Sequence, residues 1–124
     1  MKTKLTFLLS LTFLFLFSGS SVVFADDFQD GMDATNRGDF KTAYKLFLPL
    51  AEQGYAKAQL NLGLMYAQGQ GVPQDYALAH MWFNLCGSNG DKDCVKNRDI
   101  VEKKMSPSQI EEAQRMASNW KPKK

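Results

Sequence analysis

"DFKTAYKLFLPLAEQG", residues 39–54, aligns without a gap on "DYALAHMWFNLCGSNG", residues 75–90, at an offset of 36. Both stretches begin with an aspartate and an aromatic residue, carry alanine at the fifth position and phenylalanine at the ninth, and end in glycine. Self-similarity with a period of roughly 20–50 residues is typical of proteins built from stacked structural repeats. The alignment therefore predicts that the chain folds as a repeat protein.

The rest of the unit repeats more loosely. "FQDG", residues 28–31, matches "LNLG", residues 60–63, at an offset of 32, which requires a loop four residues shorter in the first unit. At the other end, "SPSQIEEAQRMA", residues 106–117, matches the segment that begins at Asp75 at an offset of 34. The chain thus contains three copies of the second half of the unit, and we expect three helix pairs.

Hydrophobic spacing indicates that the repeated segments are helices. Apolar residues recur at intervals of three and four, as one buried helical stripe requires. The first segment carries this stripe at Phe40, Ala43, Phe47 and Leu50. Beyond residue 25, no segment alternates with the two-residue period of a strand. We therefore expect an all-α fold of about six helices.

Helix boundaries are marked by local signals. Aspartate or serine favours the residue before a first turn, proline favours the opening turn, and glycine closes a helix in the left-handed conformation. A serine followed three residues later by glutamine forms a capping box. By these signals, the predicted starts are Asp39, Pro73 with Asp75, and Ser106 with Pro107 and Gln109, and the predicted ends precede Gly54 and Gly90.

The central segment resembles a known repeat. "AEQGYAKAQLNLGLMYAQGQGVPQDYALAHMWF", residues 51–83, is similar to the Sel1-like repeat, an αα-hairpin relative of the tetratricopeptide family, chiefly through "LGLMY", "GQGVPQDYA" and "MWF". The resemblance implies a solenoid of antiparallel helix pairs with right-handed superhelical stacking, within a domain of residues 26–120. The full repeat covers about 51–87, with partial units on each side. The structural repeat positions are Gly63, Tyr66, Gly71, Pro73, Asp75, Ala79 and Trp82.

Small residues inside the predicted helices are expected to be packing contacts. A glycine within a helix costs about 1 kcal/mol relative to alanine, so its use is sensible where two helices approach closely. We interpret Gly63, Ala79 and Ala43 in this way. The third unit departs from the pattern, because Arg98 stands where the full repeat has Leu62, as in a terminal repeat with a polar outer face.

The N-terminal 25 residues predict a secretory signal peptide. Two lysines precede an uncharged run from Leu5 to Phe17, and small residues follow as far as Ala25. An uncleaved membrane anchor is the alternative, but Ser18, Gly19 and two further serines interrupt the apolar run. We therefore expect cleavage after Ala25, no stable membrane insertion, and a periplasmic or secreted protein.

Charge excludes some classes of partner. The full chain has 15 basic and 13 acidic residues, and Lys2 and Lys4 leave with the signal, so the remaining chain is near neutral. The electrostatic signature of a nucleic-acid-binding protein is absent. The basic tail, residues 121–124, is expected to be a solvated, frayed end. We expect a monomer that recognises a protein partner whose identity the sequence does not give.

No residue group predicts catalysis. His80 is the sole histidine, so it cannot form a multi-histidine metal site, and we expect it to be partly exposed. The loop "AQGQGVPQ", residues 67–74, lacks the preceding strand, lysine and hydroxyl of a phosphate-binding loop. "DKD", residues 91–93, and "EE", residues 111–112, are expected to be solvated helix starts. We expect no cofactor, metal or catalytic residue.

The remaining function is recognition by a surface. The resemblance implies an adaptor for protein assemblies, and in a solenoid one layer of helices carries the residues that select the partner. Four residues share one face of the predicted helix that begins near Ala56, and we call them the binding stripe: Lys57, Asn61, Leu64 and Gln68. A merely solvated face is the alternative. Two other functions also stay open, a weak β-lactam hydrolase of the cysteine-rich Sel1-like type and a secreted effector.

Cys86 and Cys94 are the only two cysteines. They fall in the last turn of one predicted helix and the first turn of the next, where helix packing brings Cα atoms within the range that a disulfide needs. A zinc site would need further ligands, and a redox pair would use a shorter spacing. In an exported protein we expect a disulfide, with two free thiols as the alternative.

Overall fold

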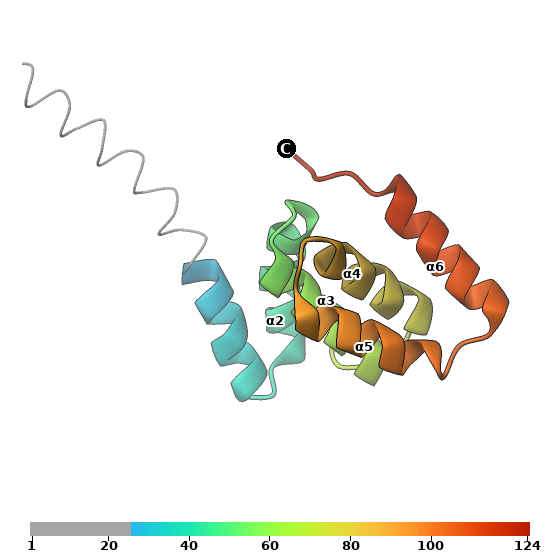
Figure 1. Ribbon diagram of the computed structural model, residues 1–124. Coiled ribbons are helices and arrows are strands. Elements are labelled where there is room, and N and C mark those ends of the chain that lie inside the picture. The colour runs from blue at the N-terminus through green and yellow to red at the C-terminus, as the bar shows by residue number, and fades with distance from the viewer. Residues whose placement is uncertain (1–25) are drawn as a thin grey trace, which may run out of the picture.

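The computed structural model describes residues 26–124, so the predicted signal peptide lies outside the described residues. Within this range the chain forms six helices and no strand (Figure 1). The first helix covers residues 26–36. The others are α2 (Phe40–Glu52), α3 (Ala56–Gln68), α4 (Tyr76–Ser88), α5 (Lys92–Glu102) and α6 (Pro107–Asn119). The prediction of an all-α solenoid of helix pairs is confirmed.

The predicted helix starts are confirmed at three positions. The carboxylate of Asp39 accepts a hydrogen bond from the Thr42 amide at 3.3 Å, and that of Asp75 accepts one from the Leu78 amide at 3.0 Å. Ser106 forms the capping box with Gln109 at the start of α6. These bonds satisfy backbone donors that have no partner in the first turn of a helix.

The expectation that Pro73 lies in the opening turn of a helix is wrong. Asp75 caps α4, so Tyr76 is the first helical residue and Pro73 lies in the preceding loop. The capping bond of Asp75 sets the start two residues later than a proline in the opening turn would place it. The predicted helix ends are confirmed, because Gly54 and Gly90 have φ values of 99° and 98° just beyond α2 and α4.

Each of the first two helix pairs is closed by a contact between a glycine of its first helix and a phenylalanine of its second helix. A Cβ atom placed on Gly31 would lie 2.5 Å from Cε1 of Phe47, and one on Gly63 would overlap the Phe83 ring. Phe47 and Phe83 are fully buried. Each glycine therefore allows a phenylalanine of the paired helix to reach its backbone, which confirms the packing role of Gly63.

The core consists of two clusters of buried side chains. The larger is built mainly from α2 and α3 and includes Phe47, Leu62 and Trp82, and the smaller joins Ala79, Phe83 and Val101 across α4 and α5. Ala43 and Ala79 are fully buried, as expected of close helix contacts. The larger cluster therefore spans the first two helix pairs, and the smaller one joins the second pair to α5.

The last helix packs differently from the others. α6 contacts α4, whereas its neighbour in sequence, α5, packs on α4 and more weakly on α3. In Figure 1, α6 diverges from α5 across the connecting segment. Only Ala113 of α6 is buried, which leaves most of this helix open to solvent. The terminal pair is therefore less closed than the two before it.

Cys86 and Cys94 form a disulfide, which confirms the prediction. Their Cα atoms are 5.9 Å apart, and both residues are fully buried. The bond joins the last turn of α4 to the first turn of α5. It fixes the point at which the second helix pair meets the third.

Candidate functional site

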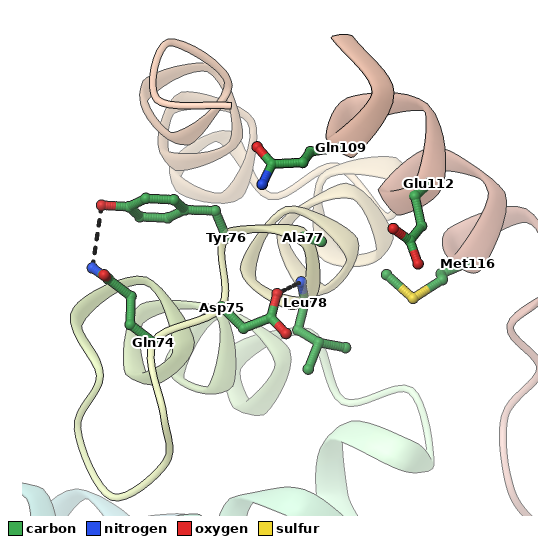
Figure 2. A pocket seen from close by; sticks show the side chains of 8 residues that line it. All are labelled: Gln74, Asp75, Tyr76, Ala77, Leu78, Gln109, Glu112 and Met116. Carbon is green, nitrogen blue, oxygen red and sulfur yellow. Dashed lines mark hydrogen bonds between the residues drawn. The ribbon is translucent and has the colours of Figure 1, made fainter. Parts of the chain in front are cut away.

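An open pocket lies between the start of α4 and α6 (Figure 2). Its volume is about 500 Å³. The lining residues come from the loop before α4, from the first turn of α4 and from one face of α6. They are Gln74, Asp75, Tyr76, Ala77, Leu78, Gln109, Glu112 and Met116.

A rigid loop positions the α4 side of the pocket. Gly71 has a φ of 74°, and a Cβ there would lie 2.7 Å from the carbonyl oxygen of Phe40, so only glycine fits. The side-chain amide of Gln74 donates to the Ala67 carbonyl at 2.9 Å and lies 3.2 Å from the Tyr76 hydroxyl. The Asp75 amide donates to the Tyr66 carbonyl at 2.9 Å. The loop is therefore tied back to the end of α3.

The capping box of α6 positions the opposite wall. Gln109 occupies the third position of the helix, and its side chain accepts a hydrogen bond from the Ser106 amide at 2.9 Å. Glu112 and Met116 follow at spacings of three and four, which places the three side chains on one face of α6. In Figure 2, these side chains project toward the α4 side of the pocket.

The pocket is negatively charged. Asp75 and Glu112 bring carboxylates to its two walls, and no basic residue lines it. One oxygen of Asp75 is engaged in capping α4, whereas Glu112 is exposed on α6. Leu78 and Met116 provide an apolar floor beside these charges. The arrangement suits a ligand group that combines a positive charge with an aliphatic stem.

The lining carries no nucleophile next to a base. Its polar groups are two carboxylates, two amides and one phenol, and none is an activated serine, cysteine or histidine. Among residues 26–124, no group of three or more histidine, cysteine, aspartate or glutamate side chains could hold a metal ion. The pocket therefore offers hydrogen bonds, charge and apolar contact for recognition.

The binding stripe lies on α3, outside the pocket. Lys57 and Gln68 are exposed, and Asn61 donates to the Lys57 carbonyl at 2.8 Å. Leu64 is half-buried and packs against the cluster of Ala79, Phe83 and Val101, so this member of the stripe also contributes to the core. The role of the stripe in binding stays a prediction.

His80 is fully buried, so the expectation of partial exposure is wrong. Its Nε2 lies 2.8 Å from a carboxylate oxygen of Glu102, a residue 22 positions later at the end of α5. When Nε2 of a neutral imidazole donates to this oxygen, Nδ1 is an acceptor, and it has no hydrogen-bond partner among residues 26–124. The pair links the first half of α4 to the end of α5, whereas the disulfide links the end of α4 to the start of α5. Neither His80 nor Glu102 lines the pocket.

Tyr66 joins the first helix pair to the second. Its hydroxyl lies 3.0 Å from that of Tyr44 on α2, and the two rings meet edge to face. Burial, reinforced by the Tyr44 hydroxyl, raises the pKa of the Tyr66 phenol well above its usual value of 10. The phenol is therefore a neutral hydrogen-bonding group at physiological pH.

Arg98 takes a role that fits a terminal unit. Its guanidinium lies 3.4 Å from the Asn84 side-chain oxygen and 3.4 Å from the Asp99 carboxylate. The side chain is 28% exposed, so it extends along the surface between α4 and α5. A leucine at this position would have no further helix pair to pack against.

The basic tail is exposed as expected, but the expectation of a frayed end is wrong. The Lys123 amide donates to the Glu52 carbonyl at 2.8 Å, and its Nζ lies 2.8 Å from the Glu52 carboxylate. Trp120, just before the tail, packs edge to face on Trp82 with ring centroids 6.4 Å apart. The chain end is therefore fixed to the end of α2.

Comparison with known proteins gives a consistent picture. The model of the Sel1 repeat family matches residues 28–55 and 56–91. The first range covers residues 28–36 of the first helix together with α2, and the second covers α3 and α4. Each matched repeat therefore contains one of the two glycine–phenylalanine contacts described above.

Curated proteins and a solved structure are among the relatives to which the chain is similar. Over 49 residues, 40% of the chain, it is 39% identical to "DAP3-binding cell death enhancer 1" from Rattus norvegicus and from Mus musculus. The crystal structure of a protective antigen present in uropathogenic Escherichia coli strains, described as displaying an SLR fold, matches 78% of the chain with 32% identity and a TM-score of 0.72. The chain spans 10% of the curated relatives and 22% of the solved chain.

Proposed function

The chain belongs to the Sel1 repeat family, and from that premise we propose that it is an exported, non-catalytic adaptor or scaffold in the bacterial envelope. Sel1 repeats and the SLR fold support a protein-interaction module in general. The single observation that carries the proposal to this chain is the acidic pocket between α4 and α6. It is the part of the described surface where charge, amide groups and apolar area face one another.

The chemistry of the pocket favours a basic side chain of a protein partner. A lysine or arginine can lay its aliphatic stem along Leu78 and Met116 and bring its charge to Glu112. The side-chain oxygen of Gln74 and the side-chain NH2 of Gln109, which do not take part in the hydrogen bonds described above, can bond a peptide backbone. The binding stripe on α3 is a second candidate surface, because Lys57 and Gln68 are exposed on a helix of the full repeat.

A pull-down with matched charge reversals tests the pocket. Purified protein is used to capture partners from envelope extract, with Glu112→Lys compared with Glu111→Lys. Each change replaces a negative charge on the exposed side of α6 with a positive one, but only Glu112 lines the pocket. We expect Glu112→Lys to reduce recovery of the partner at least tenfold and Glu111→Lys to leave it within twofold.

Equal recovery with both variants would reject the pocket as the binding surface. The same extract tests the stripe, because Lys57→Glu combined with Gln68→Ala then reduces recovery if the stripe binds. Export is measured separately by Western blotting of soluble and membrane fractions. A full-length chain in the membrane fraction would contradict cleavage.

A further inference from the structure

The C-terminal segment, residues 120–124, leaves α6 and returns to the first half of the molecule (Figure 1). Trp120 already has extended backbone angles, φ −71° and ψ 139°. Pro122 keeps the segment extended, because it has no amide hydrogen and restricts the residue before it. The segment therefore lies against the protein as an extended peptide would.

Its backbone completes the end of a helix. Glu52 is the last residue of α2, and the carbonyls of a last turn have no donor within their own helix. The amides of Gln53, Gly54 and Tyr55 bond to Pro49, Ala51 and Leu50, so none of these three donates to Glu52. The Lys123 amide supplies a donor for the Glu52 carbonyl at 2.8 Å.

The positive charge of the C-terminal segment also lies at the end of α2. The Lys123 ammonium lies 2.8 Å from the Glu52 carboxylate, at the helix end where the dipole also favours a cation. The Glu52 side chain is 25% exposed and the Lys123 side chain 71% exposed. The carboxylate is thus held in place by the protein, while the lysine reaches it from solvent.

An aromatic anchor lies three residues before the lysine. The Trp120 indole meets Trp82 edge to face, and its Cη2 would lie 3.9 Å from a Cβ on Gly54. Trp82 is 6% exposed and belongs to the larger core cluster, so Trp120 packs against a ring that the core holds in place. We call Glu52, Gly54 and Trp82 the tail site.

We propose that the tail site is a second protein-binding surface, specific for an extended segment with an aromatic residue followed three positions later by lysine or arginine, and that residues 120–124 occupy it as an internal competitor. The contacts are an aromatic edge, one backbone hydrogen bond and one partly exposed ion pair, all made by a chain end without secondary structure. Such a segment can leave without unfolding a helix. The inference rests on the proposed role in protein recognition, but it concerns a surface separate from the pocket.

The test uses the segment itself as the probe. A fluorescein-labelled, C-terminally amidated peptide of residues 118–124 is titrated with purified protein, and anisotropy is measured. The protein carries Trp120→Ala and Lys123→Glu in an otherwise complete chain, which frees the site. We expect this variant to bind the peptide at least tenfold more tightly than the wild type, because the attached segment competes at an effective concentration on the order of mM.

Further variants assign binding to the tail site. Adding Glu52→Lys to the double variant should weaken binding at least tenfold, whereas adding Glu111→Lys should not change it. A peptide with alanine in place of the tryptophan should not bind. Lys123→Glu alone alters an exposed side chain and should bind the peptide several-fold more tightly than the wild type. This single variant serves as the test if circular dichroism shows that the double variant folds poorly.

The proposal would be overturned if the wild type, the double variant and Lys123→Glu all bound the peptide with equal affinity. It would also be overturned if adding Glu52→Lys left the affinity of the double variant unchanged. Because all components are purified, this outcome is distinguishable from failure of the proposed function. The envelope pull-down can fail while the peptide binds, and the peptide can fail to bind while Glu112→Lys abolishes capture.

Discussion

At the scale of single residues, the fold depends on where a side chain is missing. Gly31 and Gly63 have equivalent places in two repeats, and each admits the ring of a phenylalanine from the paired helix. Neither glycine is needed for its backbone angles, since neither has a positive φ. These glycines are needed because they leave room for the phenylalanine rings, and this requirement can be tested by adding a methyl group.

Gly63→Ala should destabilise the protein. The substitution gains about 1 kcal/mol in helix propensity. The added methyl group overlaps the Phe83 ring, and overpacking of a core costs about 1–3 kcal/mol. Because the overlap is severe, we expect a net loss of about 1–2 kcal/mol in the free energy of unfolding, measured by urea denaturation.

The Phe83→Leu background is the control. There the same Gly63→Ala change should cost less than in the wild type, because the smaller side chain leaves room for the methyl group. A Gly63→Ala variant more stable than the wild type would contradict the close contact.

Tyr66 gives a prediction for alkaline pH. Burial raises the pKa of its phenol in the folded state, so above about pH 10 the unfolded chain loses this proton while the folded chain keeps it. Its contribution to stability is complete below pH 10 and is lost as the pH rises further. We expect the free energy of unfolding to fall above pH 10, and to fall less steeply in Tyr66→Phe.

Tyr55→Phe is the matched control, because Tyr55 is an exposed tyrosine, 38% accessible. It should keep the alkaline dependence of the wild type. Identical pH profiles for Tyr66→Phe and Tyr55→Phe would show that Tyr66 is not the group responsible.

At the scale of helices, local signals were sufficient for most of the fold. The caps at Asp39, Asp75 and Ser106 act over three residues, so the sequence around each of them specifies its bond. The disulfide was predictable for the same reason, since Cys86 and Cys94 flank one short turn. Contacts between neighbours in sequence are therefore well represented in sequence patterns.

Contacts between distant segments were not predictable in this way. His80 meets Glu102 only because α5 packs across α4, and spacing within α4 alone does not show its burial. The pocket depends on the angle at which α6 crosses α4, and the capping box marks where α6 starts but not its direction. Lys123 pairs with Glu52, 71 positions away, and no sequence motif around either residue predicts this contact.

Reduction of the disulfide tests the junction between α4 and α5. Closing a loop of nine residues stabilises a protein by about 2.5 kcal/mol in the chain-entropy model. We therefore expect reductant to lower the free energy of unfolding by about that amount, with both thiols then accessible to alkylation in the unfolded state. An unchanged unfolding curve with demonstrably reduced thiols would show that helix packing alone fixes this junction.

At the scale of the whole molecule, the two ends of the stack differ. The first two helix pairs are closed by buried phenylalanines, whereas α6 contacts α4 and leaves a pocket at its side. The C-terminal segment then returns to α2 and links the last helix to the first half of the chain. Within residues 26–124, no helix is long and apolar enough to cross a membrane. The pocket and the tail site are therefore formed by α6, by the segment that follows it and by the helices that they contact.

Site-specific photo-crosslinking in living cells tests the central claim, that the chain binds a protein through the pocket, most directly. A photoreactive benzoylphenylalanine replaces Ala77, which lines the pocket, or Lys96, which is exposed on α5 away from it. We expect a light-dependent adduct of defined mass from position 77, its loss in Glu112→Lys, and no adduct from position 96. If position 77 gives no adduct, or both positions give the same one, the chain does not bind a protein through the pocket.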